Sequence, residues 1–464
     1  MPKRINATQR TEVLHLLAQG HDRDTIAAAV GVTPGQVSAV SAHVKMGTYS
    51  LPEANEPCEE VAPVALDRTT NLLRELQILK GARGCKTHLN PILLGTDAES
   101  GEDVYWNPDQ AAGTPNPHVL ILGESGTGKT YAISCLTAEL AQEGIVSIVF
   151  DYGQGFSPKN LPDEFVNATN PVELHAGRDG VNINPLQIFP SDLLGPVNVA
   201  QRVADTFARV YTKIGVQQHA IVRRAVLDVM ADAGITQDSP DTWSSDLPAF
   251  GELQVKLNEY AGNPQNTQSR FAATAASHVS TLFVFNTFRQ NGHRLSWTDM
   301  LSARNRVVVI QLKGLEHTLE RAVTEFMLWN LIGFIEAMGP GPLRCFVVLD
   351  EAHKLSFDRG SPVEKLLREG RKFGLGLILA SQQPEDFSPV AFANTATKMV
   401  FQVGDDRSTI SRLLHRKIKN AHSFGEIYQL ITKLPRGWAY VVSENIGSVV
   451  RIASFRDRID HWRT

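Results

Sequence analysis

The sequence predicts an α/β protein with a parallel sheet covered by helices on both sides, preceded by a small all-α module. Three observations support this fold class. Short apolar runs such as 119–122 and 345–349 end in glycine-rich or acidic segments and alternate with helical patterns, as buried parallel strands do. The stretch 197–285 has helical periodicity, which predicts an all-helical insertion. Residues 1–47 show three short amphipathic helices.

Length and composition fit a soluble globular protein with one large domain, or with two domains and a linker. The 464 residues are 42% hydrophobic and 20% charged, and the formal net charge of -4 neither requires nor forbids a nucleic-acid partner. The four cysteines, Cys58, Cys85, Cys135 and Cys345, show no Cys-x-x-Cys spacing, which argues against a zinc site or a disulfide framework. Because no apolar leader or span is present, we expect a cytoplasmic protein without membrane contact.

The first 47 residues have the pattern of a helix-turn-helix module. Asp22 and Gly31 bound one short helix, and Thr33, Pro34 and Gln36 form a capping box that begins the next. In a DNA-binding module of this kind the last helix lies near the groove, and its polar residues are Gln36, Ser38, Ser41, His43 and Lys45. Docking to another protein is an equally good interpretation, and both remain open.

An acidic, proline-rich stretch at 48–66 predicts a linker, because it has too few apolar residues to pack. The large domain is placed at 67–464. A helix at 67–81 and two short strands around 90–95 and 102–107 are predicted to precede its first strong motif.

The stretch "HVLILGESGTGKT" contains a Gly-x-x-x-x-Gly-Lys-Thr loop between an apolar strand and a helical pattern. Glycines let such a loop turn its N–H groups toward phosphate oxygens, and the following helix presents its positive end to them. Lys129 is predicted to reach the β and γ phosphates, and Thr130 to bind Mg²⁺. The residues predicted to bind a nucleoside triphosphate are Gly123, Glu124, Ser125, Gly126, Thr127, Gly128, Lys129 and Thr130.

A second apolar run, "CFVVLDE", ends in two acids. At the tip of a parallel strand, Asp350 is predicted to hold Mg²⁺ and Glu351 to polarise the attacking water as general base. The alternative, in which these acids only cap the next helix, is weak beside the phosphate-binding loop. Asp151 ends another apolar run, which predicts a role in positioning water or nucleotide.

The tetrad from Asp350 to His353 spells the signature of DEAH-box helicases, but its surroundings argue against that class. Lys129 and Asp350 are about twice as far apart as in those enzymes, and too few residues follow for a second motor lobe. The next strand ends in "ILASQQP", where Ser-Ala-Thr would be expected.

Residues 88–456 resemble the HerA-like branch of the HerA and FtsK family of hexameric DNA-translocating ATPases. The resemblance is carried by "VVLDEAHKL", "LLREGRKFGLGLILASQQPEDFS", "VFDYGQGFS" and "NINPL". It implies a RecA-like P-loop core with a helical insertion, ATP and Mg²⁺ as ligands, and a homo-hexamer with double-stranded DNA in its pore. One departure is that HerA proteins usually begin with a small β-barrel, where this chain has the helix-turn-helix and linker.

The resemblance also implies roles for residues outside the two motifs. Arg371, or Arg368 as second choice, is expected to act as an arginine finger across a subunit interface, although both also fit an amphipathic surface helix. Gln382 matches the polar sensor of the γ phosphate, with Gln383 as alternative. DNA contacts in the pore would be made by basic residues that the sequence does not rank; candidates are Arg270, Arg289, Arg294 and Lys313, each of which fits an ordinary surface cation better.

The function expected from this resemblance is that of an ATPase motor partnered by a separate nuclease or other effector, in DNA processing or antiviral (anti-phage) defence. Two alternatives remain open. One is a nucleotide-dependent ring scaffold that regulates an effector enzyme, and the other is an ATP-responsive transcription regulator.

Overall fold

The computed structural model describes residues 7–18, 21–45, 89–108, 116–263, 265, 267–289, 297–302, 307–404, 410, 424–444 and 446–462. The chain divides into two compact units, Met1–Leu66 and Asp67–Thr464, which are described separately. The predicted linker at 48–66 and the predicted helix at 67–81 lie outside the described residues. Within the described ranges, no helix combines the length and the apolar character needed to cross a membrane.

The N-terminal unit contains three helices, α1 (Ala7–Ala18), α2 (Arg23–Val30) and α3 (Pro34–Lys45). Asp22 caps α2 by accepting the N–H groups of two residues in its first turn, and Gly31 ends it at φ 68°. The predicted capping box of α3 is present, since Thr33 N donates to Gln36 Oε1 at 2.8 Å and Gln36 N donates to Thr33 Oγ1 at 3.3 Å. The helices share a small core of Val13, Ile26, Ala27, Val30, Val37 and Val40.

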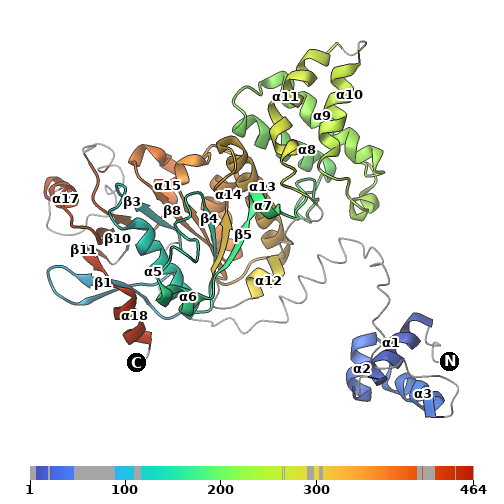
Figure 1. Ribbon diagram of the computed structural model, residues 1–464, viewed down its shortest axis with the longest axis horizontal. Coiled ribbons are helices and arrows are strands. Elements are labelled where there is room, and N and C mark those ends of the chain that lie inside the picture. The colour runs from blue at the N-terminus through green and yellow to red at the C-terminus, as the bar shows by residue number, and fades with distance from the viewer. Residues whose placement is uncertain are drawn as a thin grey trace. The chain divides into compact units, whose positions relative to one another are not determined.

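The large unit is built on one 11-stranded sheet (Figure 1). In spatial order its strands are β2 (Asp103–Trp106), β1 (Ile92–Asp97), β11 (Gly447–Ile452), β10 (Trp438–Val442), β9 (Thr397–Val400), β3 (Val119–Leu122), β8 (Leu375–Ser381), β7 (Cys345–Asp350), β4 (Val146–Asp151), β6 (Val307–Gln311) and β5 (Val172–His175). The strands from β9 to β5 run parallel. The other four extend the sheet in antiparallel fashion.

Helices cover both faces of this sheet, as the apolar strand sequences predict. In β3, Val119 and Ile121 pack into one core cluster with α5 (Lys129–Gln142), whereas Leu120 and Leu122 pack into the other with α13 (His317–Met338). The remaining helices around the sheet are α6 (Asp163–Thr169), α7 (Ala176–Asp179), α12 (Trp297–Ser302), α14 (Pro362–Glu369), α15 (Pro389–Asn394), α17 (Phe424–Ile431) and α18 (Phe455–Trp462).

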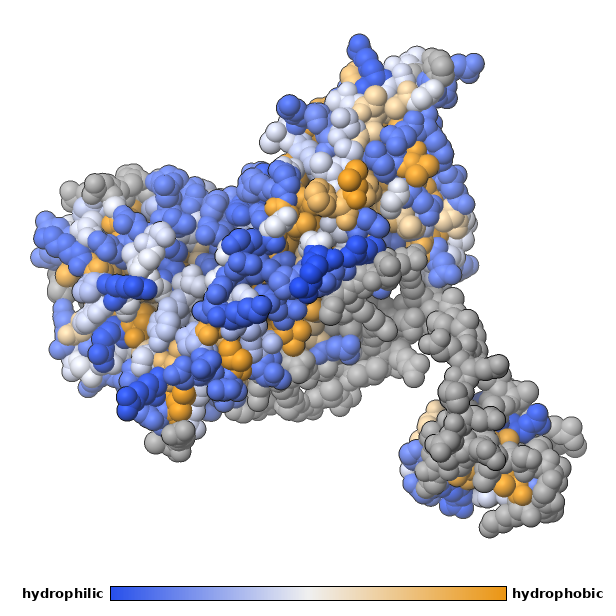
Figure 2. All heavy atoms as spheres, viewed as in Figure 1, coloured by the Kyte–Doolittle hydropathy of each residue, from blue (hydrophilic) through white to orange (hydrophobic). Residues whose placement is uncertain are grey.

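The predicted insertion is helical and contains α8 (Pro196–Val210), α9 (Val216–Asp232), η2 (Pro240–Ser244), α10 (Glu252–Gly262) and α11 (Ser269–Val284). It packs on α13 through an edge-to-face contact of Phe207 with Phe326, whose ring centroids are 5.7 Å apart. Beside this contact a buried ion pair joins Arg209 to Glu325 at 3.0 Å. Figure 2 shows hydrophobic residues at the surface of the insertion among hydrophilic ones, and its exposed apolar side chains include Val216, Val255, Val284 and Phe285.

Candidate functional site

Three neighbouring strands of the sheet bring the predicted motifs together. The end of β3 pairs with the end of β8, as Leu122 opposite Ser381, and the end of β7 pairs with β8 as Asp350 opposite Ala380. Their carboxyl ends therefore meet at one edge, which is where ligands bind in parallel α/β sheets. A cleft of about 220 Å³ opens there, lined by Ser125, Gly126, Gly128, Lys129, Thr130, Tyr131, Asp350, Glu351, Gln382 and Arg436.

The loop after β3 depends on its glycines. A Cβ on Gly123 would lie 2.6 Å from Phe401 Cβ, so no larger residue fits there. Gly128 has φ +117°, a conformation that side chains with a Cβ rarely adopt, and it is the N-cap of α5. The amino end of α5 thereby points into the cleft, where its unpaired N–H groups favour an anion.

Lys129 lies across this loop. It is 9% exposed, and its Nζ donates to the carbonyl oxygens of Gly123 at 2.6 Å and Glu124 at 2.9 Å. Burial lowers the pKa of Lys129, while the nearby charges of Asp350 and Glu351 oppose this effect. The ammonium group is thus placed between the loop and the two acids, where a γ phosphate would need a cation.

Thr130 and Asp350 form an oxygen pair that fits a divalent cation. Thr130 Oγ1 donates to Asp350 Oδ2 at 3.3 Å. Burial raises the pKa of Asp350 to about 6, and the neighbouring carboxylates of Glu351 and Asp151 contribute further. A Mg²⁺ ion bound here would relieve this crowding of negative charge. In the described part of the chain no group of three or more His, Cys, Asp or Glu forms a metal site, so phosphate and water would supply the other ligands.

Glu351 follows Asp350 directly and faces the cleft from the start of η3 (Ala352–Lys354). Its Oε2 lies 3.2 Å from His353 Nδ1, which in turn lies 3.3 Å from Ser381 Oγ at the end of β8. His353 therefore fixes the carboxylate relative to the neighbouring strand. No sequence motif assigned this role to His353. The one local feature that could have pointed to it is its place in the tetrad from Asp350 to His353, close to the predicted general base.

Gln382 and Asp151 differ in their relation to the cleft. Gln382 lines it, whereas the N–H of Gln383 donates to Asp386 Oδ2 at 3.2 Å, at the start of η5 (Pro384–Asp386). Asp151 is 2% exposed and is not among the lining residues. Its carboxylate accepts the N–H groups of Gly153 and Phe156, both at 2.9 Å, so it holds the turn after β4. A role of Asp151 in positioning water or nucleotide stays a prediction.

Arg368 and Arg371 lie at the opposite edge of the sheet from the cleft. They belong to α14 and to η4 (Gly370–Phe373), which precede β8, whereas Gln382 follows it. The seven residues of β8 span about 23 Å at ~3.3 Å per residue. In agreement, the charge of Arg371 acts on His118, which comes just before β3. Neither arginine reaches the cleft of its own chain.

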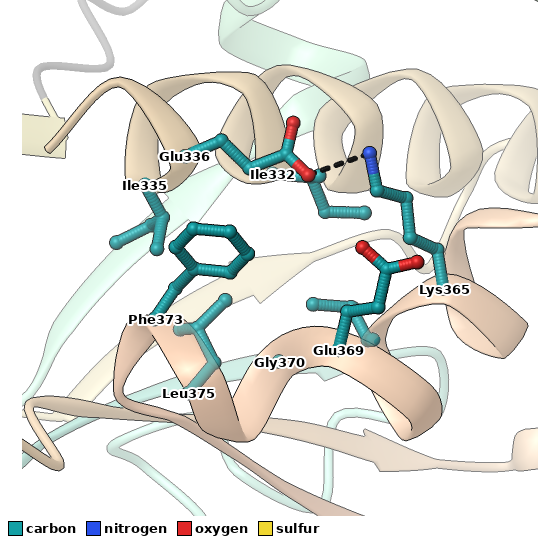
Figure 3. A pocket seen from close by; sticks show the side chains of 9 residues that line it. Ile332, Ile335, Glu336, Lys365, Glu369, Gly370, Phe373 and Leu375 are labelled. Carbon is teal, nitrogen blue, oxygen red and sulfur yellow. Dashed lines mark ion pairs between the residues drawn. The ribbon is translucent and has the colours of Figure 1, made fainter. Parts of the chain in front are cut away.

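The segment with these arginines is fixed on α13. Figure 3 shows Phe373 and Leu375 facing Ile332 and Ile335 across a small apolar pocket. An ion pair between Lys365 Nζ and Glu336 Oε1, at 2.6 Å, joins α14 to α13 beside it. The packing gives the arginines a rigid support.

The predicted DNA-contacting cations have structural partners. Arg289 donates to the carbonyl oxygens of Arg178 and Asp179, and Lys313 donates to Gln154 Oε1 at 3.0 Å. Arg270 lies over the ring of Phe271 at 4.7 Å. Arg294 is outside the described residues. Contact of these residues with DNA stays a prediction.

Comparisons with known proteins agree with this fold. Residues 114–331 match the family model of "Helicase HerA, central domain". The DNA double-strand break repair helicase HerA of Saccharolobus solfataricus is 22% identical over an alignment of 301 residues, and the match covers 62% of this chain and 54% of that protein. The chain thus spans about half the length of the curated relatives it matches.

Solved structures share the architecture of the large unit. VirB4 of Thermoanaerobacter pseudethanolicus superposes with a TM-score of 0.62 at 20% identity, over 80% of this chain and 98% of that one. The plasmid coupling protein TrwB in complex with the non-hydrolysable ATP analogue ADPNP superposes with a TM-score of 0.53 at 18% identity, over 79% of this chain and 96% of that one. TrwB in complex with ADP and Mg²⁺ superposes with a TM-score of 0.52 at 18% identity, over 80% of this chain and 97% of that one. The predicted P-loop α/β core is therefore confirmed.

Proposed function

We propose that this P-loop protein, in which residues 114–331 match the family model of the HerA central domain, is an ATPase that moves double-stranded DNA through a homo-hexameric ring. The supporting observation is the division of the catalytic groups between two edges of the sheet. The loop, the acids and Gln382 share one cleft, while Arg368 and Arg371 lie at the other edge. A second copy would bring Arg368 or Arg371 to the cleft, which neither of them reaches in its own chain.

In the proposed reaction Lys129 and the amino end of α5 hold the triphosphate, and Thr130 and Asp350 are the protein ligands of Mg²⁺. The metal neutralises charge on the β and γ phosphates when it is bound. Glu351, oriented by His353, accepts a proton from the water that attacks the γ phosphorus, and ADP leaves. Gln382 senses whether the γ phosphate is present, because it lines the same cleft between β3 and β7.

ATP hydrolysis with and without double-stranded DNA tests this function. We expect stimulation by DNA of any sequence, with binding that weakens steeply as salt rises because the contacts are to phosphates. Lys129→Ala should abolish nucleotide binding and serves as the control. Hydrolysis that DNA leaves unchanged would favour the ring scaffold, and a preference for one DNA sequence would favour a transcription regulator.

The partner is proposed to be a separate nuclease or other effector, with the N-terminal unit as its docking module. Since Met1–Leu66 forms a compact unit of its own, its removal should leave the large unit folded. Loss of partner binding with DNA-stimulated hydrolysis intact would support docking, whereas loss of DNA binding would support a groove-binding role. Copurification from the native host identifies the partner, and DNA processing or antiviral defence is the context that we propose for it.

A further inference from the structure

Arg436 lines the nucleotide cleft although no sequence motif points to it. It lies in the turn between α17 and β10, far along the chain from the phosphate-binding loop. Its side chain is exposed, and it forms no ion pair with any described residue. An arginine that pairs with no carboxylate of the described ranges, in a cleft built for phosphates, is available to an anionic ligand.

Hydrogen bonds attach this turn directly to the phosphate-binding loop. Gly437 N donates to Thr127 O at 2.9 Å, and Gly437 O accepts from Ile452 N at 3.0 Å in β11. A Cβ on Gly128 would lie 3.4 Å from Gly437 Cα, so the two backbones are in close contact. Gly437 itself has φ +81°, which lets the turn reverse at this point. The position of Arg436 is thus tied to the loop that would hold the phosphates.

The charges in the cleft are arranged on two sides. Asp350 and Glu351 come from β7, beyond β8, whereas the turn with Arg436 leads into β10 on the β9 side of β3. Among the cleft residues the cations are Lys129 and Arg436. Lys129 faces the acids, so Arg436 is the cation on the side of the loop that lies away from them.

We propose that Arg436 is a second phosphate-binding residue of the nucleotide site, which acts within its own chain and pairs with the non-bridging oxygens of the polyphosphate on the Thr127–Gly128 side of the loop. This inference rests on the proposed ATPase function. Arginine suits the role because its planar guanidinium makes paired hydrogen bonds to phosphate. Since the contact exists before the γ phosphate is cleaved, it contributes to ground-state binding of ATP and ADP alike.

Binding titrations of ATP, ADP and inorganic tripolyphosphate to the full chain test the proposal. In Arg436→Ala we expect the Kd of all three ligands to rise about tenfold or more, with kcat nearly unchanged. Arg436→Lys should recover part of the lost affinity, because lysine keeps the positive charge but cannot make the paired hydrogen bonds of the guanidinium. Lys433→Ala is the matched control, since Lys433 is an exposed cation of the same segment that does not line the cleft. The melting temperature without ligand should be the same for all variants.

Two results would overturn the inference while leaving the ATPase proposal intact. One is an ATP affinity of Arg436→Ala within twofold of the unaltered chain, measured while Lys129→Ala abolishes binding. The other is weakened ATP binding with unchanged tripolyphosphate binding, which would assign Arg436 to the nucleobase or the ribose. Failure of the unaltered chain to bind ATP would instead refute the proposed function.

Discussion

Glu351 faces the cleft with its carboxylate 3.2 Å from His353 Nδ1, in the place expected of a general base. In Glu351→Gln the amide has no basic oxygen to accept a proton, so we expect kcat to fall about 10²- to 10⁴-fold while ATP binding remains. Single-turnover hydrolysis and nucleotide retention on the isolated protein measure both quantities. Turnover near that of the unaltered chain would remove Glu351 from the mechanism.

His118 makes stability dependent on pH at a site far from the cleft. It is 1% exposed, and its Nδ1 accepts the N–H of Leu377 at 3.0 Å. Burial lowers its pKa from 6.5 to about 3, and the charge of Arg371 contributes. Below pH 6.5 the unfolded chain therefore gains a proton that the folded chain does not, and the free energy of unfolding falls until the pH reaches about 3.

The slope expected from this one group is about 1.4 kcal/mol per pH unit. His118→Gln keeps a hydrogen-bond acceptor for Leu377 but cannot titrate. Urea unfolding measures the decrease in the free energy of unfolding between pH 7 and pH 5. This decrease should be about 2 kcal/mol smaller in His118→Gln than in the unaltered chain. Equal losses in the two proteins would show that His118 is protonated in the folded state.

Residues within continuous motifs were the ones that sequence could assign. Lys129, Thr130, Asp350, Glu351 and Gln382 line one cleft, because each follows a strand whose tip is marked by its own apolar run. Arg436 and Tyr131 line it too, yet their roles depend on which segments meet at the sheet edge. Asp151 ends an equivalent strand, and its carboxylate holds the turn that follows β4, which the local sequence pattern did not show.

At the scale of single elements, α18 is held by an arginine in the core. Arg458 is 1% exposed, pairs with Glu139 of α5 at 2.8 Å, and donates to carbonyl oxygens of Leu93, Leu94 and Ala453. This side chain thus joins the end of the chain to β1 and to the helix that follows the phosphate-binding loop.

Removal of the Arg458 side chain would leave the buried carboxylate of Glu139 without its cation, with the hydrogen bond from Trp462 Nε1 at 3.1 Å remaining. We expect Arg458→Ala to lower the free energy of unfolding by about 3 kcal/mol or more. Arg456→Ala in the same helix is the control and should change it by less than about 0.5 kcal/mol, because Arg456 is exposed. Chemical denaturation of both variants decides the matter. Similar values for the two would mean that the buried pair of Arg458 and Glu139 does not stabilise the fold.

The elements of the parallel core were predictable because their apolar runs and caps are local. Both strands of the β1–β2 hairpin were also expected, but the place of β1 beside β11 was not. Pairing between segments so far apart is set by side-chain fit in the final fold, which a local pattern does not contain. The polar sequence of α18 likewise does not predict that this helix packs against the core through Arg458, because arginine is rarely buried.

At the scale of the whole molecule, the arginines that precede β8 require a second copy if they are to act on ATP. We expect Arg371→Ala to leave the Kd for ATP unchanged and to lower kcat by about 10³-fold or more. Addition of Arg371→Ala subunits to Glu351→Gln subunits should restore some hydrolysis, because a mixed interface contains one intact Glu351 and one intact Arg371. Fast hydrolysis by a single subunit in dilute solution, with ATP and DNA present, would contradict the ring.

Strand β1 has only β2 and β11 as neighbours in the sheet, so a segment near residue 95 finds its place only after residues near 450 have been made. Arg458, which follows β11 in the chain, then binds carbonyl oxygens of β1 and of the residue after β11. A nascent chain emerging from the ribosome would therefore carry the phosphate-binding loop long before the turn at Gly437 and the last strands arrive to brace it. Ribosome-bound chains stalled before residue 430 should be open to proteases in the region around β1, and protection should begin only after β11 and α18 have left the ribosome.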